Sequence, residues 1–333
     1  MPQESTAPFP QRLLLTITGI AAALTFVVIL LSAYIRLAEA GLGCSPWPAC
    51  FAQFSSETQT QAQDLLSPLR GDYQTLRVLH RVSASIVTLL VLIIASTGFR
   101  YRAEVGIGIP AGILIFTALL TVLGVNTPTR EMPLIAFGNL MGGIILLALL
   151  FWLVLRLLYG RGPATPPTSS VTYLTVIGRC ALLAVFLQIA SGGWASANYS
   201  SAACSGLFSC DHVNPSRIVS GFNPFRQLPL GQPEGILLDS SAASIMLVHH
   251  VAALLFSVVV SVCLYVLFRR ARQLRGNLLV ILVLLIATFS LGSLSALIEM
   301  PLWSGILHDV LSVLFLLATC RLTYLIQLGR GQH

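Results

Sequence analysis

Eight long, continuously apolar stretches dominate this chain of 333 residues. A bilayer core of ~30 Å is crossed by about 20 apolar residues of helix. Lipid offers no partner for backbone polar groups, so a spanning segment must be a helix or part of a closed barrel. These stretches do not alternate as barrel strands do, and they therefore predict an all-α polytopic membrane protein with eight transmembrane helices. The predicted spans are 12–36, 78–99, 106–126, 134–158, 172–196, 242–268, 276–298 and 302–326.

Charge supports this class and predicts an orientation. Only 9% of the residues are charged, against roughly 25% in soluble domains. The net charge of +7 comes from arginine alone, so we read it as a topology signal and expect no nucleic-acid partner. The positive-inside rule then predicts that both termini are cytoplasmic, and no cleavable signal peptide is recognisable before the first span. This orientation rests on the arginines of the short second, fourth and sixth connections between spans. They are Arg100, Arg102, Arg156, Arg161, Arg269, Arg270, Arg272 and Arg275.

Two constant offsets indicate an internal duplication. His80 and Asn139 are followed 169 residues later by His249 and His308. The pair Cys44 and Cys50 is followed 160 residues later by Cys204 and Cys210. We therefore expect two tandem, pseudo-symmetric four-helix bundles, residues 1–160 and 172–333. A cytoplasmic linker, 161–171, overlaps a Gly- and Pro-rich stretch.

Both cysteine pairs have C-x5-C spacing and fall in predicted non-cytoplasmic loops. An oxidising compartment permits disulfides there, so we predict Cys44–Cys50 and Cys204–Cys210. Zinc binding or thiol catalysis is the competing interpretation, although structural zinc sites usually have shorter spacings and four ligands. The other cysteines, Cys180, Cys263 and Cys320, fall in predicted helices and are interpreted as small apolar fillers.

The repeated histidine positions predict a heme site. Each lies roughly two turns below the outer end of its helix, so at 1.5 Å rise per residue all four share a depth of about 5–12 Å. Paired imidazoles on facing helices at one depth are typical of a bis-histidine heme. A hydrogen-bonded core role is the alternative, which the matched depth of His249 and His308 disfavours. His250 takes the place of Arg81 in the repeat and is not the expected ligand.

Asn139 breaks the pattern, because an amide cannot replace imidazole as a strong iron ligand. The first site is therefore expected to be five-coordinate, or to bind iron through His80 and a water or substrate group.

The segment from Arg36 to Cys50, RLAEAGLGCSPWPAC, resembles a signature of the heme A synthase family, RLTxAGL(G/S)CPDWPxC. The resemblance covers nearly the whole chain and extends to five further features. These are His80-Arg81, Gly192-Gly-Trp194, the second cysteine pair, His249 and His308.

The resemblance implies an eight-helix oxidoreductase that converts the heme O methyl group to the formyl group of heme A. It also implies a heme b cofactor between His249 and His308, with heme O as substrate at His80, the candidate catalytic and iron-binding residue of the first half. Asn139 and Arg77 stand where the family has a second histidine and a glutamate. Arg36, Arg77 and Arg81 are candidates for binding heme propionates, with contact to lipid phosphate as the alternative.

The expected function is heme A synthesis for a terminal oxidase in the bacterial inner membrane, with the heme sites near the periplasmic side. Expected partners are a heme O synthase, a membrane electron acceptor such as quinone and the lipid bilayer; a homo-oligomer is left open. The alternative is a non-catalytic heme b-binding membrane protein in heme handling or oxidase assembly. A secondary transporter is disfavoured, because the halves share one topology and show no pair of broken helices.

Overall fold

The computed structural model describes most of the chain, and every regular element in the described part is helical. The described residues are 10–39, 67–126, 132–160, 168–204, 206–210, 213, 216–228, 240–298 and 301–329.

Seven of the described helices are long and apolar enough to cross a membrane, which confirms a polytopic membrane protein. An eighth, α6, has a shorter apolar segment, Gly108–Gly124. The eight principal helices are α1 (Gln11–Glu39), α4 (Ser67–Arg100), α6 (Gly108–Asn126), α7 (Pro133–Tyr159), α8 (Ser169–Ala197), α11 (Ser240–Arg270), α12 (Arg275–Leu297) and α13 (Leu302–Gln327).

Local sequence signals explain several helix starts. Pro133 occupies the first position of α7 after an extended Met132, where a missing N–H leaves nothing unsatisfied. Pro301 is the extended residue that precedes α13. At α8, the Thr168 hydroxyl accepts a hydrogen bond from the Val171 backbone N–H, which satisfies one of the free donors of the first turn.

Helix α4 begins at Ser67, well before the predicted span starts at residue 78. The prediction marked the apolar, membrane-crossing part and missed a polar extension that continues the same helix. Pro68 lies in the first turn, where proline is tolerated. Arg77 is therefore a helical residue rather than part of the preceding loop.

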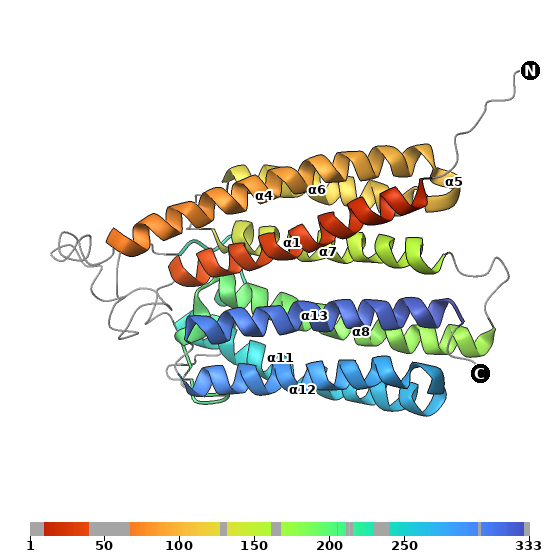
Figure 1. Cartoon of the computed structure of the whole chain (residues 1–333). Helices are drawn as coiled ribbons and strands as arrows, with labels where there is room; N and C mark the ends of the chain where they lie inside the picture. Colours follow the sequence, from red (N-terminus) through yellow and green to blue (C-terminus); the bar gives the residue numbers. More distant parts are fainter. Residues whose placement is uncertain are drawn as a thin grey trace, which may run out of the picture.

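The helices pack as two groups that touch along one side (Figure 1). In the first group, α1 and α6 each pack against both α4 and α7. In the second, α8 packs against α11 and α13, and α12 packs against the same two helices. Helices α4 and α7 are thus diagonal neighbours, as are α11 and α13. The groups meet where α13 contacts α1 and α7, and where α7 contacts α8.

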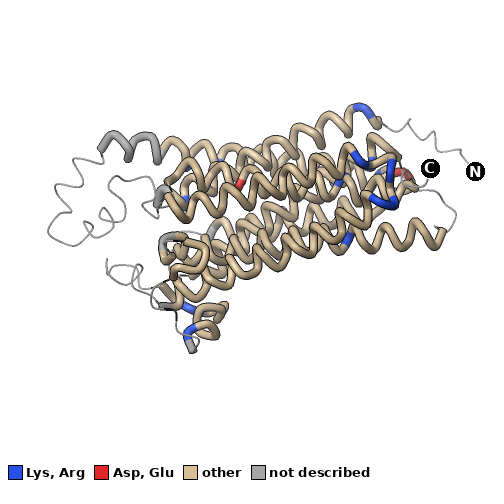
Figure 2. Tube along the Cα trace, turned by 90° about the horizontal axis from the view of Figure 1, so that it is seen from below, with Lys and Arg blue, Asp and Glu red and all other residues tan. Residues whose placement is uncertain are grey.

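Arginine residues gather toward the ends of the helices, with the larger share at the end where α1 begins and α13 ends (Figure 2). Arg100, Arg269 and Arg270 lie in the last turns of α4 and α11 at that end. In the described residues, the middle of the molecule is almost free of charged residues. Asp309 is an acidic residue within the otherwise mainly apolar helix α13. A charge at such a depth is unusual enough to suggest function.

Candidate functional site

A cavity opens inside the second helix group and is closed on one side by the first group. His249 of α11 and His308 of α13 both line it, so the structure brings together the two histidines of the predicted ligand pair. Most of its wall is apolar, including Val185, Ile189 and Leu285. Apolar walls with a few convergent polar groups are typical of ligand and cofactor sites.

The imidazole of His249 is held from α8 through one of its two nitrogens. Nδ1 lies 3.0 Å from the Ser191 hydroxyl and 3.2 Å from the Gln188 amide nitrogen. The other amide atom, Gln188 Oε1, is buried without a hydrogen-bond partner. In the tautomer with hydrogen on Nδ1, the Ser191 oxygen accepts from Nδ1–H. Amide O and N are assigned from the network, and exchanging those of Gln188 gives Nδ1–H a second acceptor. This tautomer leaves the Nε2 lone pair of His249 available to a metal, as second-shell partners commonly do.

Two glycines make room for the two imidazoles. A Cβ atom on Gly192 of α8 would lie 3.0 Å from Cε1 of His249, and one on Gly292 of α12 would lie 2.9 Å from Cε1 of His308. Contacts this short force one group to move, so any side chain at these positions displaces a histidine ring. Each histidine therefore lies against a neighbouring helix that carries no side chain at the point of contact.

Unpartnered polar atoms concentrate at this cavity. In the described part of the chain, seven buried side-chain N or O atoms lack a hydrogen-bond partner. Four of them belong to cavity residues: Gln188 Oε1, Thr288 Oγ1, Ser295 Oγ and His308 Nδ1. The His308 ring lies close to the Thr288 backbone carbonyl, so the first three are the atoms that lack any partner. Leaving such a group unpaired costs about 1–3 kcal/mol, and a cluster of them calls for an explanation such as a missing ligand.

These features fit a heme group. Imidazoles from two diagonal helices line an apolar cavity, and the Nε2 lone pair of His249 would be available to bind the heme iron. Bundle interiors are common places for such a cofactor. His249 and His308 are the residues that would hold the iron.

The same cavity contains an ion pair between a buried arginine and a half-buried aspartate, which joins the two helix groups. Arg36 of α1 is 9% exposed, and its Nε donates a hydrogen bond to Ser196 Oγ of α8 at 2.8 Å. Its Nη2 lies 3.9 Å from Oδ2 of Asp309 on α13. Both charged residues line the cavity. The sequence makes Arg36 a candidate for the first heme site, whereas the structure places it beside the residues predicted to form the second.

The residues predicted for the first site lie on the first helix group, outside this cavity. His80 and Arg77 of α4 are half-buried, Arg81 is exposed, and Asn139 of α7 is half-buried. α4 and α7 are diagonal, as are the helices of His249 and His308. The roles of these four residues in binding substrate remain predictions.

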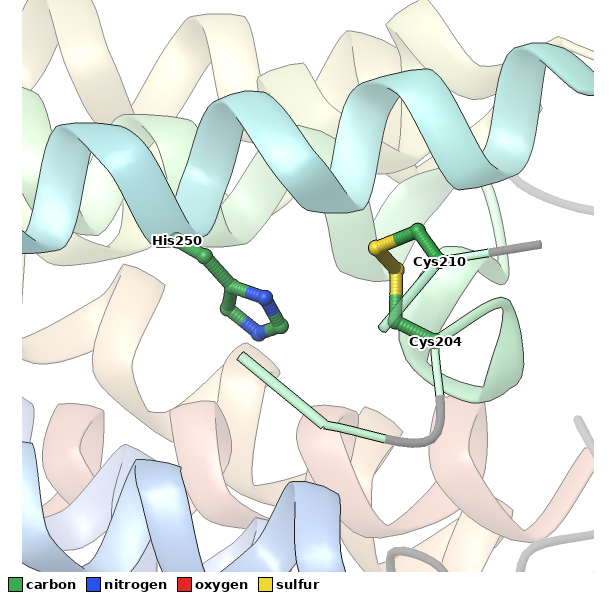
Figure 3. A group of neighbouring side chains, drawn as sticks. All are labelled: Cys204, Cys210 and His250. Atoms are coloured by element: carbon green, nitrogen blue, oxygen red, sulfur yellow. A yellow bond between two sulfur atoms is a disulfide. The ribbon is translucent and has the colours of Figure 1, made fainter. Parts of the chain in front are cut away.

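A disulfide loop covers part of the cavity. Cys204 and Cys210 are bonded, which confirms one predicted disulfide; Cys44–Cys50 lies outside the described residues. Leu207, inside this loop, lines the cavity, and its carbonyl accepts a hydrogen bond from His250 Nδ1 at 2.8 Å. The His250 ring lies beside the disulfide (Figure 3). One potential metal-ligand atom each of Cys204, Cys210 and His250 lies within 4.8 Å of the others. The sulfurs are bonded to each other, so we interpret His250 as a support for the loop.

The three remaining cysteines of the described residues differ in burial. Cys263 and Cys320 are buried, as predicted for apolar fillers. Cys180 is exposed on α8, so that interpretation is wrong for this residue. The apolar sequence around Cys180 does not reveal this exposure.

Sequence reasoning missed several cavity residues. Asp309 and Gln188 are polar residues within predicted spans, and intramembrane polarity was the signal that could have identified them. Gly292 carries no distinguishing signal in one sequence, because only the position of the His308 ring gives it a role.

Comparison with known proteins adds two findings. A family described as cytochrome oxidase assembly protein, COX15-CtaA, matches residues 15–320. A heme A synthase from Shewanella oneidensis is 30% identical over 309 residues, which cover 90% of this chain and 92% of that protein. The family match includes every residue of the cavity described above.

Proposed function

The chain belongs to the COX15-CtaA family of cytochrome oxidase assembly proteins, and from that premise we propose that it oxidises heme O to heme A for a terminal oxidase. The similarity to a heme A synthase over nine-tenths of the chain supports this reaction. A methyl group and one water give a formyl group, with release of four protons and four electrons. An oxidoreductase of this kind needs a place to bind heme O and a route by which electrons leave.

The cavity between α8, α11, α12 and α13 is proposed to hold heme b, whose iron would be bound by His249 and His308. The observation that carries this assignment is the pairing of two imidazoles, each against a glycine, in a cavity that gathers unpartnered polar atoms. Heme bound there supplies one-electron redox chemistry. The protein's own part is to fix the His249 tautomer through Gln188 and Ser191, to exclude water with apolar walls, and to place Arg36 nearby.

The first helix group is proposed to bind heme O. His80, the candidate catalytic and iron-binding residue, and Asn139 lie on diagonal helices, in the same relation as His249 and His308. Asn139 would bind iron more weakly than a histidine, which suits a substrate that must enter and leave. Arg77 and Arg81, near the outer end of α4, are proposed to bind the heme O propionates.

The proposed organisation is eight spans, with α6 as the eighth, in two four-helix halves, 1–160 and 172–333, joined by residues 161–171. The arginines at the end where α1 begins support cytoplasmic termini. His249 and His308 lie near the opposite end, so the heme sites are proposed to be near the periplasmic face of a bacterial inner membrane. Heme O synthase, a quinone acceptor and a second copy of the chain are proposed partners.

A non-catalytic heme b-binding protein is the second candidate. Asn139 and Arg77 favour it, because both depart from the family pattern in the proposed substrate half while His249 and His308 match it.

Co-expression with a heme O synthase, followed by extraction of the pigments, separates the two functions. Heme A or hydroxylated heme O in the extract supports the enzyme. Heme b together with unchanged heme O supports the non-catalytic protein. A strain that expresses the heme O synthase alone is the control.

A further inference from the structure

Arg36 is a cation of one helix group that lies in the cavity of the other. Its helix, α1, packs against α4 and α7, yet the guanidinium reaches Ser196 of α8 at 2.8 Å and Asp309 of α13 at 3.9 Å. Asp309 directly follows His308 in the chain, and both residues line the cavity with Arg36. A guanidinium and a carboxylate paired with it therefore both lie at the edge of the proposed heme site.

Burial strengthens the electrostatic effect of Arg36. The guanidinium of arginine stays protonated in proteins, and Arg36 is only 9% exposed. Charge interactions are screened far less in a protein interior than in water. A nearby cation stabilises the reduced iron, which carries one positive charge fewer than the oxidised iron. A nearby carboxylate has the opposite effect.

We propose that Arg36 and Asp309 tune the reduction potential of the heme between His249 and His308, Arg36 raising it and Asp309 lowering it. This inference rests on the proposed heme b site and goes beyond it, because it gives a residue of the first helix group control over the redox site of the second. A raised potential favours acceptance of the electrons that oxidation of the heme O methyl group releases. Arg36 acts through the electrostatic field and is a positioning residue, not a ligand.

A purely structural role for the pair makes a different prediction. If Arg36 only joins α1 to α8 and α13, then loss of either charge loosens the same interface. Such loosening changes heme retention or thermal stability, and it gives no reason for the two variants to shift the potential in opposite directions.

The test is a potentiometric titration of the purified, heme-containing full-length protein, in which the optical spectrum reports the fraction of reduced heme. We expect Arg36→Gln to lower the midpoint potential, Asp309→Asn to raise it, and Arg36→Lys to stay close to the unchanged protein. Arg321→Gln is the matched control, because Arg321 is an exposed arginine of α13 bonded to Asn277. It lies thirteen residues beyond His308, about 20 Å along the helix, and its loss should leave the potential unchanged.

The proposal is overturned if Arg36→Gln keeps the potential of the unchanged protein, or if both variants shift it the same way. If Arg36→Gln does not fold, the remaining two variants test the proposal. It is overturned if the midpoint potential of Asp309→Asn does not rise, or if that of Arg36→Lys departs from the unchanged protein as far as that of Asp309→Asn does. Failure of the underlying heme site is distinguishable, since the unchanged protein would then show no low-spin bis-histidine spectrum.

Discussion

Arg36 donates a hydrogen bond from Nε to Ser196 Oγ at 2.8 Å, and the two residues are 160 positions apart in the chain. The same offset carries Cys44 onto Cys204 and Cys50 onto Cys210. Positions that the duplication makes equivalent therefore touch each other, as residues close to a twofold axis between two halves would. In the second half a small hydroxyl replaces the cation, and that exchange lets a single guanidinium cross the interface toward Asp309.

Substituting alanine for Gly192 or Gly292 should displace the histidine ring behind it, because the added Cβ would lie within 3.0 Å of Cε1. Overpacking of this kind costs about 1–3 kcal/mol, so heme content after purification should fall in both variants. Gly276→Ala is the matched control for Gly292, since it lies on the same helix with nothing within 4 Å of the added atom. Equal heme content in all three variants would refute the packing of the rings.

Gln188→Leu should weaken heme binding through His249, because it removes a hydrogen-bond partner of Nδ1 while keeping a similar volume. Loss of a second-shell partner typically reduces metal affinity about 10–100-fold. The rate of heme transfer to an excess of apomyoglobin measures the effect. Gln188→Glu restores an acceptor and should release heme more slowly than Gln188→Leu; the reverse order would contradict the tautomer assigned to His249.

Cys204→Ser should loosen the loop that carries Leu207 over the cavity. Closing so short a loop stabilises a protein by about 2 kcal/mol in the chain-entropy view, so the thermal midpoint should fall and heme should become more accessible to small ligands such as cyanide. Cys180→Ser removes an exposed free thiol and serves as the control. His250→Gln should share part of the effect, because it alters the hydrogen bond to Leu207.

Restoring the family residues in the first half tests whether its departures are losses. We expect the double variant Asn139→His, Arg77→Glu to increase heme A formation in co-expression, because it restores a second imidazole and an acid one turn before His80. Pigment extraction measures the yield. Reduced heme A would instead show that this chain uses its own groups in that half.

The hydropathy pattern predicted the helices well, because lipid forces each apolar stretch into one structure. It missed the polar beginning of α4, whose length does not depend on apolarity. The offset of 169 residues identified His249 and His308, which share one cavity. It could not reveal that Arg36 faces the second group of helices, since contact between groups depends on packing that one sequence does not encode locally. The contacts of Ser191 and Gln188 with His249 join two helices of one group, and their packing is likewise not encoded locally, although Gln188 is a polar residue within a predicted span.

The central claim is that His249 and His308 together hold one heme iron. Low-temperature electron paramagnetic resonance of the oxidised full-length protein tests it most directly, in the unchanged chain and in His249→Ala, His308→Ala and Asn139→Ala. The account predicts a low-spin bis-histidine signal that disappears in each histidine variant and persists in Asn139→Ala. The same signal surviving unchanged in either histidine variant would contradict it.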